Sequence, residues 1–218
     1  MKKLNPINFH IISLFPDSMR AYLDESILGR AQRERKIKVS YYNPRDFTKD
    51  KWRRVDRRPY AGGPGMVLEA ESILKAAQRA LKGRTAEILF LSPAGKQFNT
   101  AYAKRLAKGK KNILIIAGHY EGVDARVAKI LKAKEISIGP YILTGGEVPA
   151  MAIVDAVARY VPGVLGKYES LEDERISASE VYTRPEVLKW KGKSHRVPKV
   201  LLSGHHKKIE EWKRSKKN

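Results

Sequence analysis

Cysteine is absent from this chain of 218 residues. Without thiols the protein can form no disulfide framework, thiolate metal site or cysteine nucleophile, and its composition suits a reducing compartment. Long apolar runs are also missing: none approaches the roughly 18 residues of a membrane-spanning helix, and Met1–Phe15 lacks the cleavage pattern of a secretory signal. We therefore expect a cytoplasmic protein with no membrane partner, and no cluster of metal-ligating residues is evident in the sequence.

Acidic residues are few, with 23 Asp and Glu against 44 Lys and Arg, which leaves a formal charge of +21. Such an excess predicts a polyanionic partner, RNA or DNA first, with a basic solvated surface as the alternative explanation. Thr48–Arg58 surrounds Trp52 with basic side chains and is followed by Pro59 and Tyr60, a mixture suited to phosphate contacts and stacking. A second basic zone runs from Lys189 to the end of the sequence.

Apolar periodicity divides most of the chain into alternating strands and helices. The first βα unit is predicted from a strand over Asn8–Phe15 and a helix that starts at an N-cap, Asp17, and runs through Leu23. Further helices are predicted over Glu69–Leu81, Asn99–Ala107, Val123–Leu131 and Glu147–Tyr160, and further strands over Ile88–Leu91, Ile113–Ala117 and Ile136–Ile138. Alternation at this short spacing indicates an α/β fold, in which helices cover both faces of a parallel sheet.

The composition changes after Pro162. Residues 1–166 hold the alternating elements, whereas residues 167–180 are polar, comparatively acidic and without apolar periodicity, which is typical of a flexible linker. Residues 181–218 are too few to bury a core of their own. We therefore expect one α/β domain, a linker, and a small, mostly helical C-terminal domain that docks on another surface.

Three predicted strands each end in a glycine-containing loop, with the sequences SPAG, GHYEG and GPYILTGG. Open α/β sheets bind ligands at the carboxyl ends of their strands, so the three loops should converge on one pocket. None matches the dinucleotide or P-loop patterns. With Tyr120 and Tyr141 nearby, the pocket suits a planar, largely neutral ligand such as adenosine, although any one of these glycines alone more often merely turns the chain. The Gly-Pro block Arg57–Met66 is either a nucleic-acid loop or a connecting turn.

Eight motifs in a fixed order connect these features to a known family. They are FHIISLFPDSM (Phe9–Met19), RPYAGGPGM (Arg58–Met66), LSPAG (Leu91–Gly95), GHYEGVD (Gly118–Asp124), SIGPYILTGGE (Ser137–Glu147), VPGVLG (Val161–Gly166), YTRPEV (Tyr182–Val187) and VPKVLLSGHH (Val197–His206). Read together, they resemble the bacterial tRNA (guanine-N1)-methyltransferase family of the SPOUT superfamily. One such string would be weak evidence, but eight in order are highly specific.

The resemblance implies a SPOUT methyltransferase domain over residues 1–166, whose parallel sheet carries a C-terminal trefoil knot, an exception to the rule that chains avoid knots. It also implies a small C-terminal tRNA-binding domain over residues 181–218. The cofactor would be S-adenosylmethionine, with a magnesium requirement as a family trait. The substrate would be N1 of the guanosine just 3′ of the tRNA anticodon, at position 37. The protein would be a homodimer whose active site is shared between subunits.

By the same resemblance, the cofactor would be held by residues of the three glycine loops: Leu91, Ser92, Pro93, Gly95, Gly118, Tyr120, Glu121, Gly122, Ser137, Ile138, Gly139, Pro140, Tyr141, Ile142, Leu143, Gly145 and Gly146. Arg159 would stabilise the charge that develops at guanine O6, and a linker carboxylate would remove the N1 proton. The residues expected to bind tRNA are Arg53, Arg54, Arg58, Tyr60 and Arg184.

Two positions depart from the family pattern. Ala178 stands where the family has its linker Asp, so Glu180, Asp173 and Glu174 are the available carboxylates, and we choose Glu180 as the base. Pro140 replaces an acidic residue that is common in the third glycine loop. Two alternatives remain: a related SPOUT enzyme acting on another RNA or base, and an RNA-binding protein with impaired catalysis. The motif pair RPYAGGPGM and YTRPEV favours the guanine-N1 enzyme over other SPOUT branches.

Overall fold

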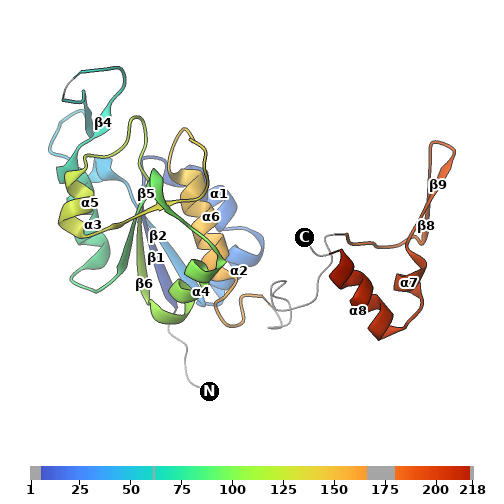
Figure 1. The fold of residues 1–218 in the computed structure, drawn as a ribbon. Coiled ribbons are helices and arrows are strands. Elements are labelled where there is room, and N and C mark those ends of the chain that lie inside the picture. Colours follow the sequence, from blue (N-terminus) through green and yellow to red (C-terminus); the bar gives the residue numbers. More distant parts are fainter. Residues whose placement is uncertain (1–5, 61, 166–179, 217–218) are drawn as a thin grey trace. The chain divides into compact units, whose positions relative to one another are not determined.

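Five parallel strands form the sheet at the centre of the first of two compact units (Figure 1). The structure is a computed structural model that describes residues 6–60, 62–165 and 180–216, and the units are Met1–Leu165 and Gly166–Asn218. The strand order is β2-β1-β6-β5-β7. In chain order the strands are β1 (Ile7–Ile12), β2 (Ile37–Tyr42), β5 (Glu87–Gln97), β6 (Asn112–Ile116) and β7 (Lys134–Ser137).

Helices cover both faces of this sheet, as the alternating pattern predicted (Figure 1). One face packs against α1 (Pro16–Leu23), α2 (Ser26–Arg33), α4 (Thr100–Gly109) and α6 (Glu147–Ala158), and the other against α3 (Ala70–Leu81) and α5 (Arg126–Leu131). The central strand β6 shows why two cores form: Ile113 and Ile115 join the first cluster, and Leu114 and Ile116 join the second. Successive side chains of a strand point to opposite faces, so an apolar run such as Ile113–Ile116 is buried on both.

Short elements complete the first unit around the basic run: η1 (Pro44–Asp46), β3 (Asp56–Arg57) and β4 (Val67–Leu68). None of the described helices is long and apolar enough to cross a membrane.

Two helix starts differ from the predictions by more than one residue. Helix α1 begins at Pro16 and its N-cap is Phe15, so the prediction of Asp17 as N-cap was wrong; Asp17 lies in the first turn. Proline has no N–H and its fixed φ suits the first helical position. Helix α5 begins at Arg126 rather than Val123, because the backbone N–H of Asp124 donates to the carbonyl of Leu68 at 3.0 Å and holds this stretch extended.

The segment between β7 and α6, residues 138–146, crosses from the sheet edge to the end of β6. There the N–H of Gly146 donates to the carbonyl of Gly118 at 2.7 Å, and Gly145 pairs with His119. A Cβ on Gly146 would lie 2.7 Å from Cα of Ala117, so the close approach of α6 to this strand end requires glycine. This crossing places the third glycine loop beside the second.

The second unit contains a hairpin as well as the expected helices. Strands β8 (Val187–Trp190) and β9 (Lys193–Arg196) pair antiparallel, and α7 (Lys199–Leu202) and α8 (His206–Ser215) follow. None of the described residues of this unit is buried. The linker predicted over residues 167–180 lies outside the described residues, apart from Glu180.

Candidate functional site

A cavity of about 250 Å³ lies at the carboxyl ends of β5, β6 and β7. The three glycine loops supply its walls, so they converge on one pocket as predicted. Every residue predicted to hold a cofactor lines this cavity except Gly95 and Pro140. Four further residues line it that the sequence reasoning did not select, although they lie beside selected ones: His119, Ile136, Thr144 and Pro149.

Gly95 and Pro140 do not line the cavity. A Cβ on Gly95 would lie 2.4 Å from the backbone nitrogen of Ile136, so this glycine allows the end of β5 to pass against β7. Strand β5 continues to Gln97, but its pairing register with β7 breaks between Leu91 and Lys96, which frees the SPAG loop to reach the cavity. Pro140 is exposed.

The walls are rich in backbone groups and apolar side chains. Tyr141 is 53% exposed, Ile142 84% and Leu143 39%, an unusual exposure for adjacent large apolar residues. Tyr120, in the second glycine loop, is 46% exposed. Aromatic and aliphatic surface beside the backbone of three glycine loops suits a planar ligand with polar edges, such as an adenine nucleoside.

Glu147, in the first turn of α6, connects three segments around the cavity. Its Oε1 accepts a hydrogen bond of 2.7 Å from Oγ of Ser13, which follows β1, and its Oε2 lies 3.5 Å from Nδ1 of His119 in the second glycine loop. Glu147 is 9% exposed and Ser13 2%. The His119 ring also packs against Phe15 and Tyr120, with ring centroids 4.8 Å apart in each pair. A buried carboxylate at a helix N-terminus is stabilised by these partners and by the helix dipole.

The Gly-Pro block is attached to the cavity wall. The N–H of Glu121 donates to the carbonyl of Met66 at 3.0 Å, and the N–H of Leu68 donates to the carbonyl of Gly122 at 3.0 Å. A Cβ on Gly65 would lie 2.4 Å from the Glu121 carboxylate, so the two loops are in direct contact. Of the two readings left open for Arg57–Met66, this contact favours a loop that belongs to the site.

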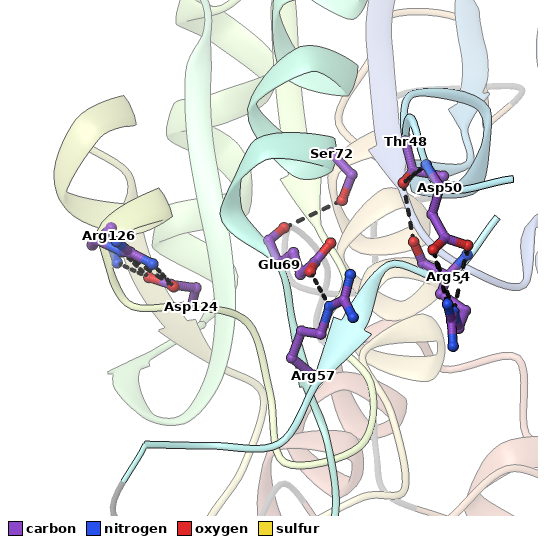
Figure 2. A network of polar contacts seen from close by, with 8 residues as sticks. All are labelled: Thr48, Asp50, Arg54, Arg57, Glu69, Ser72, Asp124 and Arg126. Carbon is purple, nitrogen blue, oxygen red and sulfur yellow. Dashed lines mark hydrogen bonds and ion pairs between the residues drawn. The ribbon is translucent and has the colours of Figure 1, made fainter. Parts of the chain in front are cut away.

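The basic side chains around Trp52 are exposed and partly paired. Figure 2 shows two of these ion pairs, those of Arg54 and Arg57. Arg54 pairs with Asp50 at 3.1 Å and Arg57 with Glu69 at 2.6 Å, yet 58% and 62% of these arginine side chains remain exposed. Arg53 pairs with Asp46 and is equally open to solvent. The neighbouring Arg58 is exposed, Tyr60 is 98% exposed and Trp52 69%. These ion pairs orient guanidinium groups at the surface and leave them accessible to an anionic ligand.

Arg159, the cation predicted to act in catalysis, does not line this cavity. Arg159 is the C-cap of α6, whereas the cavity lies at the N-terminal end of that helix, by Gly146 and Pro149. At about 1.5 Å per residue, Pro149 and Arg159 are roughly 15 Å apart along the helix axis. Arg159 instead lines a second cleft, of about 340 Å³, with Tyr22 and Asp155. The hydroxyl of Tyr22 donates to Asp155 at 2.6 Å there.

Glu180 lies in the second unit. Its carboxylate is 2.9 Å from Nζ of Lys216 and accepts a hydrogen bond of 2.7 Å from the hydroxyl of Tyr182. Lys216 first, and then Tyr182, hold the pKa of Glu180 below its ordinary value. Arg184 is exposed in the same unit. Asp173, Glu174 and Ala178 lie outside the described residues.

Metal ligands do not gather in the part of the chain that the structure describes: no three or more His, Asp or Glu side chains are grouped there in a way that would hold an ion.

A parallel α/β sheet whose glycine loops enclose a cavity at the ends of its strands, next to exposed arginines and aromatics, is typical of an α/β protein that binds a nucleoside-like ligand. Comparison with known proteins identifies the family. The family described as "tRNA (Guanine-1)-methyltransferase TrmD" matches residues 7–218, and the chain belongs to that family. This membership confirms the resemblance drawn from the eight motifs.

Individual relatives agree with the family. The chain is 45% identical to the tRNA (guanine-N(1)-)-methyltransferase of Pseudoalteromonas atlantica over 94% of this chain and 78% of that protein. It is 46% identical to the protein of that name from Dictyoglomus turgidum, over 95% and 84%. The crystal structure of tRNA (m1G37) methyltransferase from Aquifex aeolicus is similar with a TM-score of 0.80 and 39% identity, covering 97% of this chain and 89% of that one. The SPOUT-type sheet expected from the sequence is thereby confirmed.

Proposed function

We propose that this protein methylates N1 of the guanosine immediately 3′ of the tRNA anticodon, position 37, with S-adenosylmethionine as methyl donor. The cavity of three converging glycine loops carries the proposal, because it occurs in a chain that belongs to the tRNA (guanine-1)-methyltransferase family. Relatives named for this reaction match more than nine-tenths of the chain. The reaction takes place in the cytoplasm, where tRNA is available.

The residues of the cavity fit the proposed cofactor. Gly139, Gly145 and Gly146 bring backbone close to the pocket, and a Cβ on any of them would lie within 2.7 Å of a neighbouring atom. The exposed rings of Tyr120 and Tyr141 offer apolar faces to an adenine ring. When bound there, S-adenosylmethionine supplies an activated methyl group on its sulfonium.

Two side chains would act on the guanine itself. The N1 proton must leave as the methyl arrives, and O6 gains negative charge, so the site requires a base and a cation. Arg159 is the cation, held at the end of α6. A linker carboxylate is the base, and we assign Glu180. Because Lys216 and Tyr182 lower its pKa, Glu180 must leave these partners to become an effective base. Unchanged single-turnover methylation in Glu180→Gln would reject this assignment in favour of Asp173 or Glu174.

The distance between Arg159 and the cavity supports a shared active site. One side of α6 carries residues that follow one another at intervals of three or four positions: Val148, Ala152, Asp155 and Arg159. Val148 is 53% exposed on this side, and Tyr22, bonded to Asp155, is 52% exposed. A helix that is apolar on most sides is normally covered. We propose that a second copy covers it, so that Arg159 of one subunit serves the cofactor cavity of the other.

The tRNA contacts extend outward from the cavity. Arg53, Arg54 and Arg58 would contact phosphates of the anticodon arm, and Tyr60 would stack on a nucleotide. Arg184 would contribute from the C-terminal unit. The attachment of the Gly-Pro block to the second glycine loop couples these contacts to the cavity.

The decisive experiment measures transfer of labelled methyl from S-adenosylmethionine to a tRNA transcript with guanosine at position 37, beside a matched transcript with adenosine there. Label on the guanosine transcript alone is expected. Measurable cofactor binding without label on either transcript would instead identify an RNA-binding protein with impaired catalysis. Repeating the assay with EDTA and with added magnesium tests the metal requirement that family membership suggests.

A further inference from the structure

The β8–β9 hairpin exposes two large apolar side chains that the mechanism does not use. Trp190 is 64% exposed and Leu188 52%. A two-residue turn joins the strands at Lys191 and Gly192, both with positive φ, which is the geometry of a tight hairpin. An isolated two-stranded hairpin is marginally stable in water. Its exposed apolar residues therefore indicate a binding surface.

The strand register assigns these side chains to one face. Leu188 lies opposite His195, and Trp190 lies opposite Lys193. Directly opposed residues share a face, and alternate residues of a strand do too. Trp190, Leu188, His195 and Lys193 therefore form one surface, which we call the Trp190 face.

The charge of the hairpin identifies the kind of partner. Lys189, Lys191, Lys193 and Arg196 give four formal positive charges between Val187 and Arg196, and this stretch contains no acidic residue. Apart from Val187, which is half-buried, all its residues are exposed. An aromatic ring flanked by ammonium groups on an exposed ribbon is the combination that binds unpaired nucleotides: the ring stacks on a base and the cations contact phosphates.

We infer that the Trp190 face binds an unpaired base of the RNA substrate by stacking on the indole, while Lys191 and Lys193 contact the flanking phosphates. This inference rests on the proposed function, because it takes tRNA as the partner. It adds a base-contacting element in the C-terminal unit, separate from the basic run around Trp52.

The test compares Trp190→Ala and Trp190→Tyr with the unmodified full-length protein. Affinity is measured for a tRNA transcript and for heparin, a polyanion without bases, by fluorescence anisotropy at one fixed salt concentration. A stacked base contributes on the order of tenfold in affinity. Trp190→Ala should therefore weaken tRNA binding about tenfold and leave heparin binding unchanged, whereas Trp190→Tyr, which keeps an aromatic face, should stay within about threefold for both ligands.

The double variant Lys191→Ser with Lys193→Ser separates charge from stacking. It should weaken the binding of both tRNA and heparin. It should also make tRNA affinity depend less steeply on salt concentration, because fewer counterions are released. Unchanged tRNA affinity in Trp190→Ala would overturn the inference, as would equal losses for tRNA and heparin. A change in oligomeric mass in Trp190→Ala would also overturn it by assigning the face to a protein contact. If the unmodified protein bound no tRNA, the proposed function would fail together with this inference. If Trp190→Ala bound and methylated tRNA as well as the unmodified protein, only this inference would fail.

Discussion

The hydroxyl of Ser13 donates a hydrogen bond of 2.7 Å to the carboxylate of Glu147, joining the end of β1 to the start of α6 across 134 positions of sequence. Both groups are buried, and the same carboxylate faces His119 in the cavity wall. The bond therefore links the stability of the sheet to the shape of the proposed cofactor site.

Ser13→Ala should destabilise the protein by about 1–3 kcal/mol, because it removes a hydrogen bond to a buried charge. The same change should weaken S-adenosylhomocysteine binding, since Glu147 would no longer be held against the second glycine loop. Urea denaturation and calorimetric titration measure the two effects. Ser40→Ala, at a half-buried serine of β2, is the matched control and should shift stability by less than about 0.5 kcal/mol. Equal effects of the two substitutions would disprove the link.

Gly146→Ala should abolish most cofactor binding. The added Cβ would meet Cα of Ala117 at 2.7 Å and the nitrogen of Gly118 at 2.9 Å, and backbone atoms cannot give way as a flexible side chain does. The start of α6 must then shift away from the cavity. Gly109→Ala is the control, because a Cβ there meets nothing within 4 Å and alanine is the better helix former by about 0.5–1 kcal/mol. Normal cofactor affinity in Gly146→Ala would show that this contact does not shape the site.

Arg159→Ala should lower the methyl-transfer rate by about 100-fold or more through loss of charge stabilisation at O6. Cofactor affinity should stay unchanged, because the proposed role of Arg159 is to contact guanine O6 and not the cofactor. Arg33→Ala, at an exposed arginine of α2, should leave the rate unaffected. A parallel loss of cofactor affinity in Arg159→Ala would contradict the role assigned to Arg159 at guanine O6.

Mixing the Gly146→Ala and Arg159→Ala proteins tests the shared active site. If Arg159 serves the other subunit, a mixed dimer contains one complete site, formed by the intact cavity of the Arg159→Ala chain and the intact arginine of its partner. Mixtures refolded together should then recover part of the activity that each variant lacks alone. No recovery, with mixed dimers demonstrated by native mass spectrometry, would place each site within a single chain.

Glu87 should make stability depend on pH. Burial by itself would raise its pKa, but the ammonium of Lys134, 2.5 Å away, and that of Lys110, 3.3 Å away, together hold the pKa below the ordinary 4.5. A depressed folded pKa means that the charged carboxylate stabilises the protein above pH 4.5, and that this contribution is lost as the pH falls through the folded value.

Glu87→Gln should therefore cost about 1–3 kcal/mol at pH 7 and progressively less below about pH 4. Urea denaturation at a series of pH values measures this convergence. Glu135→Gln, at an exposed glutamate, is the control, and its free energy of unfolding should differ little from that of the unmodified protein at every pH. A Glu87→Gln deficit that stays constant down to pH 3 would show that the lost stability does not come from the charge.

Local sequence determined most of the fold and the location of the cavity. The apolar run Ile113–Ala117 predicted β6 because a strand buried on both faces must be continuously apolar, and the shorter run Ile136–Ile138 predicted the buried end of β7. Glycine loops after such strands must meet at one edge, so the cavity followed from pattern alone. The edge strand β2 and helix α2 were missed. Ile37–Tyr42 is buried only at its first residue and mixes polar with aromatic side chains, which weakens its strand pattern.

Tertiary structure decided what depends on contacts between distant residues. The Ser13–Glu147 bond, the attachment of the Gly-Pro block to the second glycine loop and the start of α5 at Arg126 each depend on partners that no local window contains. Arg159 shows the same limit most clearly: the family pattern named the residue, but only the folded helix shows that it stands a helix length from its own cavity. Periodicity reports which side of an element is buried, whereas the distance between two side chains is set by how the elements pack.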